Sequence, residues 1–113
     1  MMKTRIEHDL LGDREVPADA YWGVHTLRAV ENFPISGRPV GEIRELVRAL
    51  ASIKAAAAMA NADLGLLSPE RRDAIVAACE ELRAGKLHDQ FVVDTIQGGA
   101  GTSTNMNANE VIA

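Results

Sequence analysis

The segment Gly98–Gly101 and the three hydroxyl residues after it are the clearest candidates for chemistry in this sequence. Three glycines in four positions let a backbone come close to a ligand. A helix is predicted to start directly afterwards, and the first turn of a helix has unpaired N–H groups and the positive end of the helix dipole. The hydroxyl groups add further donors. This combination predicts an anion-binding site, whose candidate contacts are Gly101, Thr102, Ser103 and Thr104.

Carboxylate suits this loop better than phosphate. No lysine follows the glycines as in a P-loop, and no strand with a Gly-x-Gly-x-x-Gly turn precedes the helix. One exposed helix end contributes only about 0.3–1 kcal/mol towards binding an anion. A tight site therefore needs donors from elsewhere. The competing interpretation is a flexible turn whose threonine caps the helix without any ligand.

Asn105, Asn107 and Asn109 are a second unusual feature, because asparagine is a poor helix former. Three alternate positions cannot all lie on one face of a helix. We expect some of these amides to form hydrogen bonds with a neighbouring loop or with a substrate. Local capping of the backbone is the alternative.

Other reactive residue types form no recognisable constellation. His8, His25 and His88 are scattered, so neither a metal site nor a cofactor is predicted. No serine lies in a nucleophile motif, so no catalytic residue is assigned. Cys79 occupies the apolar face of a predicted helix, which favours a core role. Lys54 interrupts another apolar face, either as a buried ion-pair partner or with its amine extended to water.

The composition is that of one small soluble domain. The 113 residues are 47% hydrophobic and 25% charged, and a net charge of −4 without a basic cluster argues against nucleic-acid binding. No apolar run approaches the roughly 20 residues that span a membrane, and the N-terminus lacks the apolar stretch of a signal peptide. A single cysteine is typical of a reducing compartment, so we expect a cytoplasmic protein.

The elements that must position the loop are predicted to be mainly helical. Residues 1–39 form an arm, which is either irregular or a short β-hairpin with strands on both sides of Gly12-Asp13. Residues 20–32 have room for a turn or two of helix. Residues 40–84 are predicted to form an antiparallel helical hairpin. The last part, 98–113, is the glycine-rich loop and a helix start.

The helical hairpin has the most distinct signals. The first helix, 40–64, has apolar residues at steps of three and four: Val40, Ile43, Leu46, Val47, Leu50, Ile53, Ala57 and Ala60. Gly65 favours its end, and Ser68-Pro69 favours the start of the second helix, which Gly85 closes.

The two remaining stretches have weaker signals. Phe91-Val92-Val93, within 86–97, fits either a strand or a buried turn. The final helix reaches Ala113 with no stop signal, and from this we expect a truncated chain.

These segments together resemble the aspartase/fumarase superfamily over nearly the whole chain. The most specific is 97–113, with the sequence QGGAGTSTNMNANEVIA, which is similar to the first signature block of that superfamily. The arm agrees in the segments 9–12 (DLLG) and 15–29 (EVPADAYWGVHTLRA), and the first long helix agrees in 54–61 (KAAAAMAN).

Within the superfamily the sequence is more similar to the aspartate ammonia-lyase branch than to the class II fumarate hydratase branch. Hydratases usually have Thr-Gly-Ser-Gly-Thr-Gln-Ser-Asn where this chain has 98–105, and glutamine at the position of His25. Ala100 lacks the hydroxyl that a hydratase uses to hold substrate or water. The hydratase stays the alternative.

The resemblance implies a carbon–nitrogen lyase that converts L-aspartate to fumarate and ammonia by anti-elimination. A base removes the proton beside one carboxylate, and hydrogen-bond donors stabilise the resulting doubly negative enediolate. Thr102 is implied to donate to a carboxylate of this small dicarboxylate substrate, and Ser103 and Thr104 are weaker candidates. A homotetramer, whose active sites each use several subunits, is also implied.

Several parts of that superfamily's machinery are missing from this sequence. They are the catalytic serine in a Gly-Ser-Ser loop, the substrate-binding lysine beside it, a second carboxylate-binding block and a Thr-His pair. We therefore interpret residues 1–113 as a truncated N-terminal lyase domain that is inactive alone. A free-standing helical interaction module is the remaining alternative.

Overall fold

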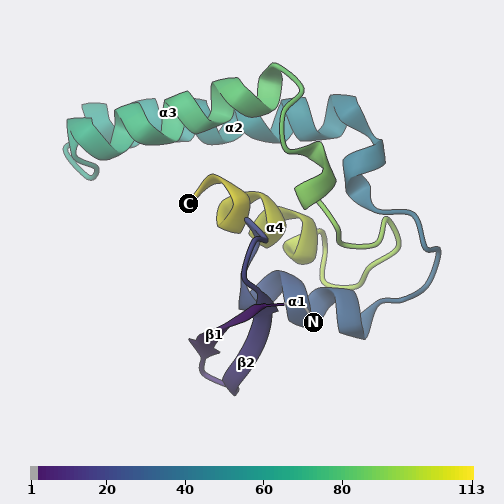
Figure 1. The fold of residues 1–113 in the computed structure, drawn as a ribbon. Helices are drawn as coiled ribbons and strands as arrows, with labels where there is room; N and C mark the ends of the chain where they lie inside the picture. The colour runs from purple at the N-terminus through teal and green to yellow at the C-terminus, as the bar shows by residue number, and fades with distance from the viewer. Residues whose placement is uncertain (1–2) are drawn as a thin grey trace.

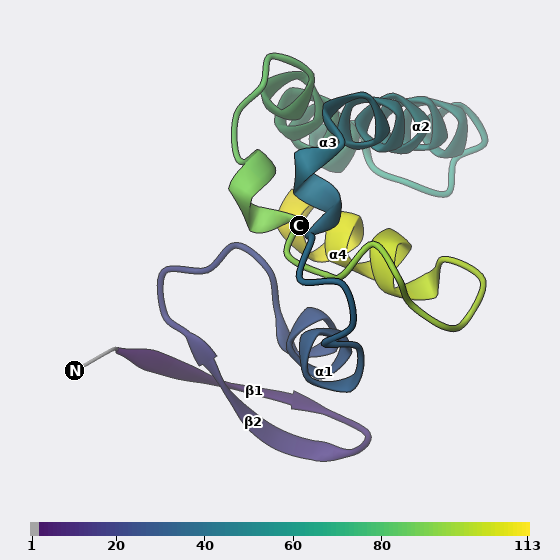
Figure 2. The same ribbon diagram turned by 90° about the vertical axis from the view of Figure 1, so that its right-hand side faces the viewer.

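The computed structural model describes residues 3–113 as a mainly helical fold with one small β-hairpin, which confirms the predicted fold class. The elements are β1 (Thr4–Asp9), β2 (Gly12–Pro17), α1 (Val24–Asn32), the 3-10 turn η1 (Val40–Glu42), α2 (Arg44–Asp63), α3 (Pro69–Arg83), the 3-10 turn η2 (His88–Gln90) and α4 (Thr102–Ile112). In Figure 1 the hairpin of α2 and α3 lies above α4, and α1 lies below it. The side view in Figure 2 keeps this order, so α4 forms the middle layer.

The β-hairpin lies beyond α1, at the far side of the molecule from α2 and α3 (Figure 2). Its strands pair antiparallel, from Thr4 opposite Pro17 to Asp9 opposite Gly12. The predicted turn at Gly12-Asp13 is therefore wrong by two residues, because the turn lies at 10–11 and Gly12 begins β2. The Asp9 carboxylate explains this position, since it accepts the Leu11 N–H at 2.9 Å and so closes the turn earlier.

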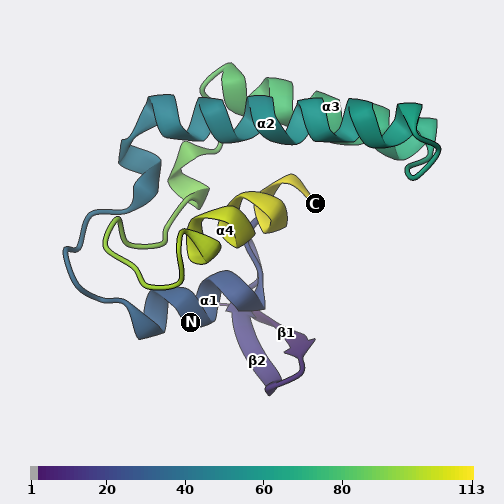
Figure 3. The ribbon, with the colours of Figure 1, turned by 180° about the vertical axis from the view of Figure 1, so that it is seen from behind.

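The helical hairpin forms as its end signals predict. Ser68 caps α3 by accepting the Arg71 N–H at 3.3 Å, and a proline occupies the first helical position. Gly65 and Gly85 follow the two helices with φ of 75° and 96°, a region that favours glycine. Figure 3 shows α2 and α3 side by side along their length from the rear.

The start of α2 and its buried face differ from the prediction for 40–64. The first residues form η1 instead, because Val40 and Gly41 donate to the carbonyl oxygens of Val93 and Phe91 at 2.9 and 3.0 Å. Pairing with a distant segment thus replaces the first helical turn.

The side of α2 that is buried carries mainly alanine, while Ile53 is 60% exposed. Small residues let neighbouring helices approach closely, and this selects the alanine face. Four predicted core positions are therefore exposed: Ile43, Ile53, Ala57 and Ala60. The buried residues of the helix are Val47, Ala51, Ala55 and Ala58.

Phe91-Val92-Val93 lies in a buried turn directly after η2, which decides between the predicted strand and the predicted buried turn in favour of the turn. Phe91 and Val93 are each 1% exposed, and an isolated antiparallel bridge joins Pro39 to Asp94. This segment fills the space between α2 and α4, and Cys79 lies in the same core, as predicted. Within residues 3–113, no helix combines the length and apolar character needed to cross a membrane.

Candidate functional site

The glycine-rich loop enters α4 through an unusual backbone path. Gly99, Ala100 and Gly101 have φ of 88°, 54° and 84°, so three consecutive residues lie in the left-handed region. Glycine adopts this conformation readily, whereas a non-glycine residue such as Ala100 does so uncommonly. Residues 98–102 are exposed. The loop therefore presents backbone to solvent at the start of a helix, as the anion-site prediction requires.

Thr102 is the exposed hydroxyl of the site. Its Oγ1 donates to the carbonyl oxygen of Gly99 at 2.6 Å, and its N–H donates to the same atom at 3.0 Å. A hydroxyl has one proton to donate. To donate to a ligand, the Thr102 side chain must therefore turn away from Gly99, while it can accept without any change.

The other two hydroxyl residues point into the protein. Ser103 is only 5% exposed. Thr104 donates through both its N–H and its Oγ1 to Gln97 Oε1, at 2.9 and 3.0 Å. The structure thus separates the predicted contacts: Gly101 and Thr102 lie on the surface of the loop, and the other two lie behind it.

The helix cap also differs from the competing interpretation. Gly101 is the N-cap residue and has no side chain to cap with, so no threonine caps this helix. Among residues 3–113, no acceptor takes the N–H of Ala100, Gly101 or Ser103. Unpaired N–H groups at a helix start attract anions. The loop therefore keeps backbone donors that its own fold does not use.

Behind the loop lies Asp94, which sequence reasoning did not single out. This carboxylate is 7% exposed and accepts the N–H groups of Ile96, Ser36 and Gly37 at 2.7, 2.9 and 2.9 Å. The Ser36 hydroxyl adds a fourth hydrogen bond at 2.7 Å. The Ile96 N–H and the Ser36 hydroxyl, ahead of the other donors, lower the pKa of Asp94 to about 2. Asp94 thereby joins the loop's entry to the segment that connects α1 and α2.

One asparagine of α4, Asn107, forms the predicted contact to a neighbouring loop. Asn107 is fully buried; its Oδ1 accepts the N–H groups of Val92 and Val93 at 2.9 and 3.3 Å, and its Nδ2 donates to the Gln90 carbonyl oxygen at 3.0 Å. Asn105 lies on the other side of the helix and accepts from the Lys54 amine. Lys54 is therefore neither in a buried ion pair nor free in water, since it contacts an amide of α4.

Two carboxylates from other elements accept the first N–H groups of α1, Glu110 from α4 and Glu7 from β1. Glu110 accepts the N–H groups of His25 and Thr26, at 3.1 and 2.9 Å, and the Thr26 hydroxyl. Glu7 accepts the Val24 N–H at 2.9 Å. These three N–H groups belong to the first turn of α1, whose N-cap, Gly23, offers no side chain. Glu110 therefore acts as a cap from another helix and fixes α4 relative to α1.

An ion pair attaches the β-hairpin to α1. Arg28 forms two hydrogen bonds of 2.8 Å to the Asp9 carboxylate, and these lower the pKa of Asp9. Arg28 thus has a structural partner within the described residues. His25 contributes its backbone N–H to Glu110, while its Nδ1 is buried without a partner in residues 3–113.

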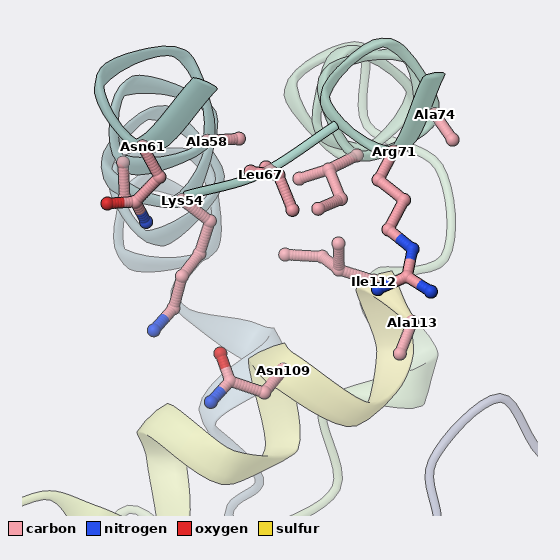
Figure 4. Close-up of a pocket in the computed structure, with 11 residues that line it drawn as sticks. Lys54, Ala58, Asn61, Leu67, Arg71, Ala74, Asn109, Ile112 and Ala113 are labelled. Carbon is pink, nitrogen blue, oxygen red and sulfur yellow. The ribbon is translucent and has the colours of Figure 1, made fainter. Parts of the chain in front are cut away.

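A groove of about 630 Å³ lies elsewhere, between α2, α3 and the end of α4 (Figure 4). Lys54 and Asn109 approach each other across it from α2 and α4, and Arg71 reaches down from α3. None of the residues 98–104 lines it. This groove and the predicted anion site are therefore different places.

Comparison with known proteins places these features among lyases. A family model described as "Lyase" matches residues 12–113. The chain is 63% identical over 110 residues to the aspartate ammonia-lyase of Pseudomonas aeruginosa, covering 97% of this chain and 23% of that protein. It is 63% identical over 109 residues to the class II fumarate hydratase of Halobacterium salinarum, covering 96% and 23%.

Solved structures give the same result. The fumarate lyase:delta crystallin structure from Brucella melitensis matches with a TM-score of 0.96 and 58% identity, covering 98% of this chain and 26% of that one. The class II fumarase of Schistosoma mansoni matches with a TM-score of 0.88 and 39% identity, covering 97% and 23%. The chain thus spans about a quarter of the length of the relatives it matches.

Proposed function

Since this chain belongs to the lyase family whose model matches residues 12–113, we propose that it is the N-terminal part of an aspartate ammonia-lyase, which converts L-aspartate to fumarate and ammonia. The observation that carries the proposal is the loop at 98–102. It combines an exposed threonine hydroxyl with backbone N–H groups that have no acceptor in the described residues. The aspartate ammonia-lyase of Pseudomonas aeruginosa, at 63% identity, supports the reaction assigned.

The loop's proposed task is to hold one carboxylate of the dicarboxylate substrate. Thr102 turns its hydroxyl from Gly99 to the carboxylate, and the N–H groups around Gly101 supply further donors. Thr104 supports the loop from inside through its contacts to Gln97, and the buried Ser103 beside it keeps an N–H that has no acceptor in the described residues. Donors aimed at a carboxylate become more valuable when the proton beside it leaves, because negative charge then accumulates on those oxygens.

The proposed base and the rest of the pocket lie outside this chain. No Gly-Ser-Ser segment occurs in the sequence. We therefore infer that the 113-residue chain has no lyase activity alone. From the family resemblance and the single cysteine we also propose that the complete enzyme is a cytoplasmic homotetramer, in which other segments complete each site.

A class II fumarate hydratase is the second candidate, because the Halobacterium salinarum hydratase is as similar as the ammonia-lyase, at 63% identity. Ala100 favours ammonia elimination, since its methyl group provides no hydroxyl to hold water at the position where hydratases have serine. The left-handed backbone of Ala100 keeps this position exposed at the tip of the loop.

Paired assays decide between these reactions. The complete protein encoded by the reading frame that contains this chain is supplied with L-aspartate, with ammonia and fumarate measured as products. It is then supplied with fumarate alone, with malate measured. We expect ammonia and fumarate in equal amounts and no malate. Malate without ammonia release would establish the hydratase, and activity in the purified 113-residue chain would overturn the inferred need for further segments.

A further inference from the structure

We propose that Gln97 is a positioning residue for the carboxylate-holding loop, acting through the first turn of α4. This inference rests on the proposed function. The Gln97 amide spans the two ends of the glycine-rich loop. Its Oε1 accepts the N–H and Oγ1 of Thr104 at 2.9 and 3.0 Å, and its Nε2 donates to the Asp94 carbonyl oxygen at 2.7 Å.

Gln97 replaces the missing cap of α4. A capping side chain normally belongs to the N-cap residue and accepts the N–H of the second or third helical residue. Here the N-cap is Gly101, and the third helical residue is Thr104. Gln97 therefore supplies, from four residues before the N-cap, the acceptor that Gly101 lacks. The glycine can keep its left-handed backbone without leaving that N–H unpaired.

The direction of the amide is fixed by its partners. A backbone N–H can only donate, and a carbonyl oxygen can only accept. Oε1 must therefore face Thr104, and Nε2 must face Asp94. A carboxylate or a hydrocarbon of the same size cannot satisfy both ends. The loop geometry therefore requires an amide at position 97, and a side chain of the same volume without its donor and acceptor would not be sufficient.

The hydrogen bonds of Gln97 to Thr104 and Asp94 matter because of the residues that lie between these two partners. Gly98, Gly99 and Gly101 have wide conformational freedom when unrestrained, and Ala100 is held in a conformation that alanine adopts uncommonly. Asp94, which is itself fixed by four hydrogen bonds, anchors one end, and α4 anchors the other. A restrained loop loses less entropy when a ligand binds. Gln97 therefore acts on substrate affinity without contacting the substrate.

The test uses the complete lyase and two isosteric variants. Gln97→Met removes both hydrogen-bonding groups and keeps the side-chain length. The matched control is Gln90→Met, because the Gln90 Oε1 also accepts a backbone N–H, that of Tyr21 at 2.9 Å, but lies outside the loop. For each variant we would measure KM and kcat for aspartate. We would also measure amide hydrogen exchange of the intact enzyme in the segment 97–105. A milder variant, Gln97→Asn, is too short to reach both partners and serves if Gln97→Met does not fold.

We expect Gln97→Met to raise KM about tenfold with a smaller change in kcat, and to speed hydrogen exchange in 97–105. Gln97→Asn should change both in the same direction by less, and Gln90→Met should leave KM within about twofold of the parent enzyme. Equal KM changes in Gln97→Met and Gln90→Met, or no change in either, would refute the positioning role while the parent's activity stands. A parent enzyme with neither lyase nor hydratase activity would refute the proposed function and this inference with it.

Discussion

Removing the Glu110 carboxylate should destabilise the fold through α1, although Glu110 belongs to α4. In Glu110→Ala, the N–H groups of His25 and Thr26 and the Thr26 hydroxyl lose their acceptor. Thr26 is fully buried, so water cannot readily replace the carboxylate there. This substitution therefore tests whether Glu110 of α4 caps the start of α1.

The magnitude follows from the number and type of these contacts. Hydrogen bonds to a charged group contribute about 1.5–3 kcal/mol each, and losing a helix cap alone costs about 0.5–2 kcal/mol. Such contributions are not additive at one site, and the His25 end is partly open to water. We expect Glu110→Ala to lower the free energy of unfolding by about 2–4 kcal/mol, a large share of the 5–15 kcal/mol typical of a domain.

Urea denaturation followed by far-ultraviolet circular dichroism measures this change. The matched control is Glu81→Ala, which removes an exposed glutamate from α3 and should stay within about 0.5 kcal/mol of the parent. A loss in Glu110→Ala no larger than that of the control would refute the cap.

Gly23 supplies an independent test of the same contact. A Cβ at Gly23 would lie 2.6 Å from an oxygen of Glu110 and 2.6 Å from an oxygen of Glu7. The Gly23 φ of −120° suits any residue, so Gly23→Ala acts through these carboxylates and not through backbone strain. Once Glu110 is gone, the alanine displaces less. The double variant should therefore lose less free energy of unfolding than the two single variants lose together, by at least about 0.5 kcal/mol. If the losses simply add, Gly23→Ala does not act through Glu110.

Three further perturbations test the site and its support. Asn107→Leu leaves two N–H groups and a carbonyl oxygen unpaired in the core, and should lower the free energy of unfolding in urea by about 2–4 kcal/mol. Because the pKa of Asp94 is about 2 in the fold against an ordinary 3.8, Asp94 stabilises the fold fully above about pH 5 and loses this effect as the pH falls from about 4 to about 2. In Asp94→Asn the urea midpoint should fall less steeply over that pH range than in the parent protein. The same pH dependence in both proteins would contradict a stabilising role of the Asp94 carboxylate. Thr102→Val in the complete enzyme should raise KM for aspartate about tenfold or lower kcat. Its melting temperature should change less than that of Thr104→Val, because only the Thr104 hydroxyl donates to Gln97.

The sequence predicted those features that depend on neighbouring residues. Ser68 and Pro69 start α3 because a hydroxyl cap and a preset φ act within one turn. Gly65 and Gly85 end the two helices because few other residues adopt their backbone conformation easily. Each signal is complete within five residues of the chain, so no knowledge of the tertiary fold is needed to interpret it.

Features that depend on distant residues were missed or misplaced. Periodicity predicted Ile53 as a core residue of the first long helix, yet the alanine face is buried because α3 and α4 approach from that side. Glu110 lies 84 positions from Thr26, and Asp94 lies 58 positions from Ser36. An acidic residue next to apolar ones gives no indication of which distant N–H groups it will accept. The anion site at the loop stays a prediction, and the contacts that support this loop could not be predicted from the sequence.

The role proposed for the loop requires that its contact residues and its supporting residues differ. A residue that donates to a substrate has to keep a donor unpaired in the free protein, which leaves the nearby backbone without a local tie. The N–H groups of Ala100, Gly101 and Ser103 meet that requirement within the described residues, whereas the Thr102 hydroxyl meets it only after it turns away from Gly99. The restraint must then come from side chains that are hydrogen-bonded within the fold, as Gln97 and Asp94 are. Exchanging these roles would fail, because an N–H group already held by the fold could not bind a carboxylate, and a glutamine without hydrogen-bond partners could not restrain the loop.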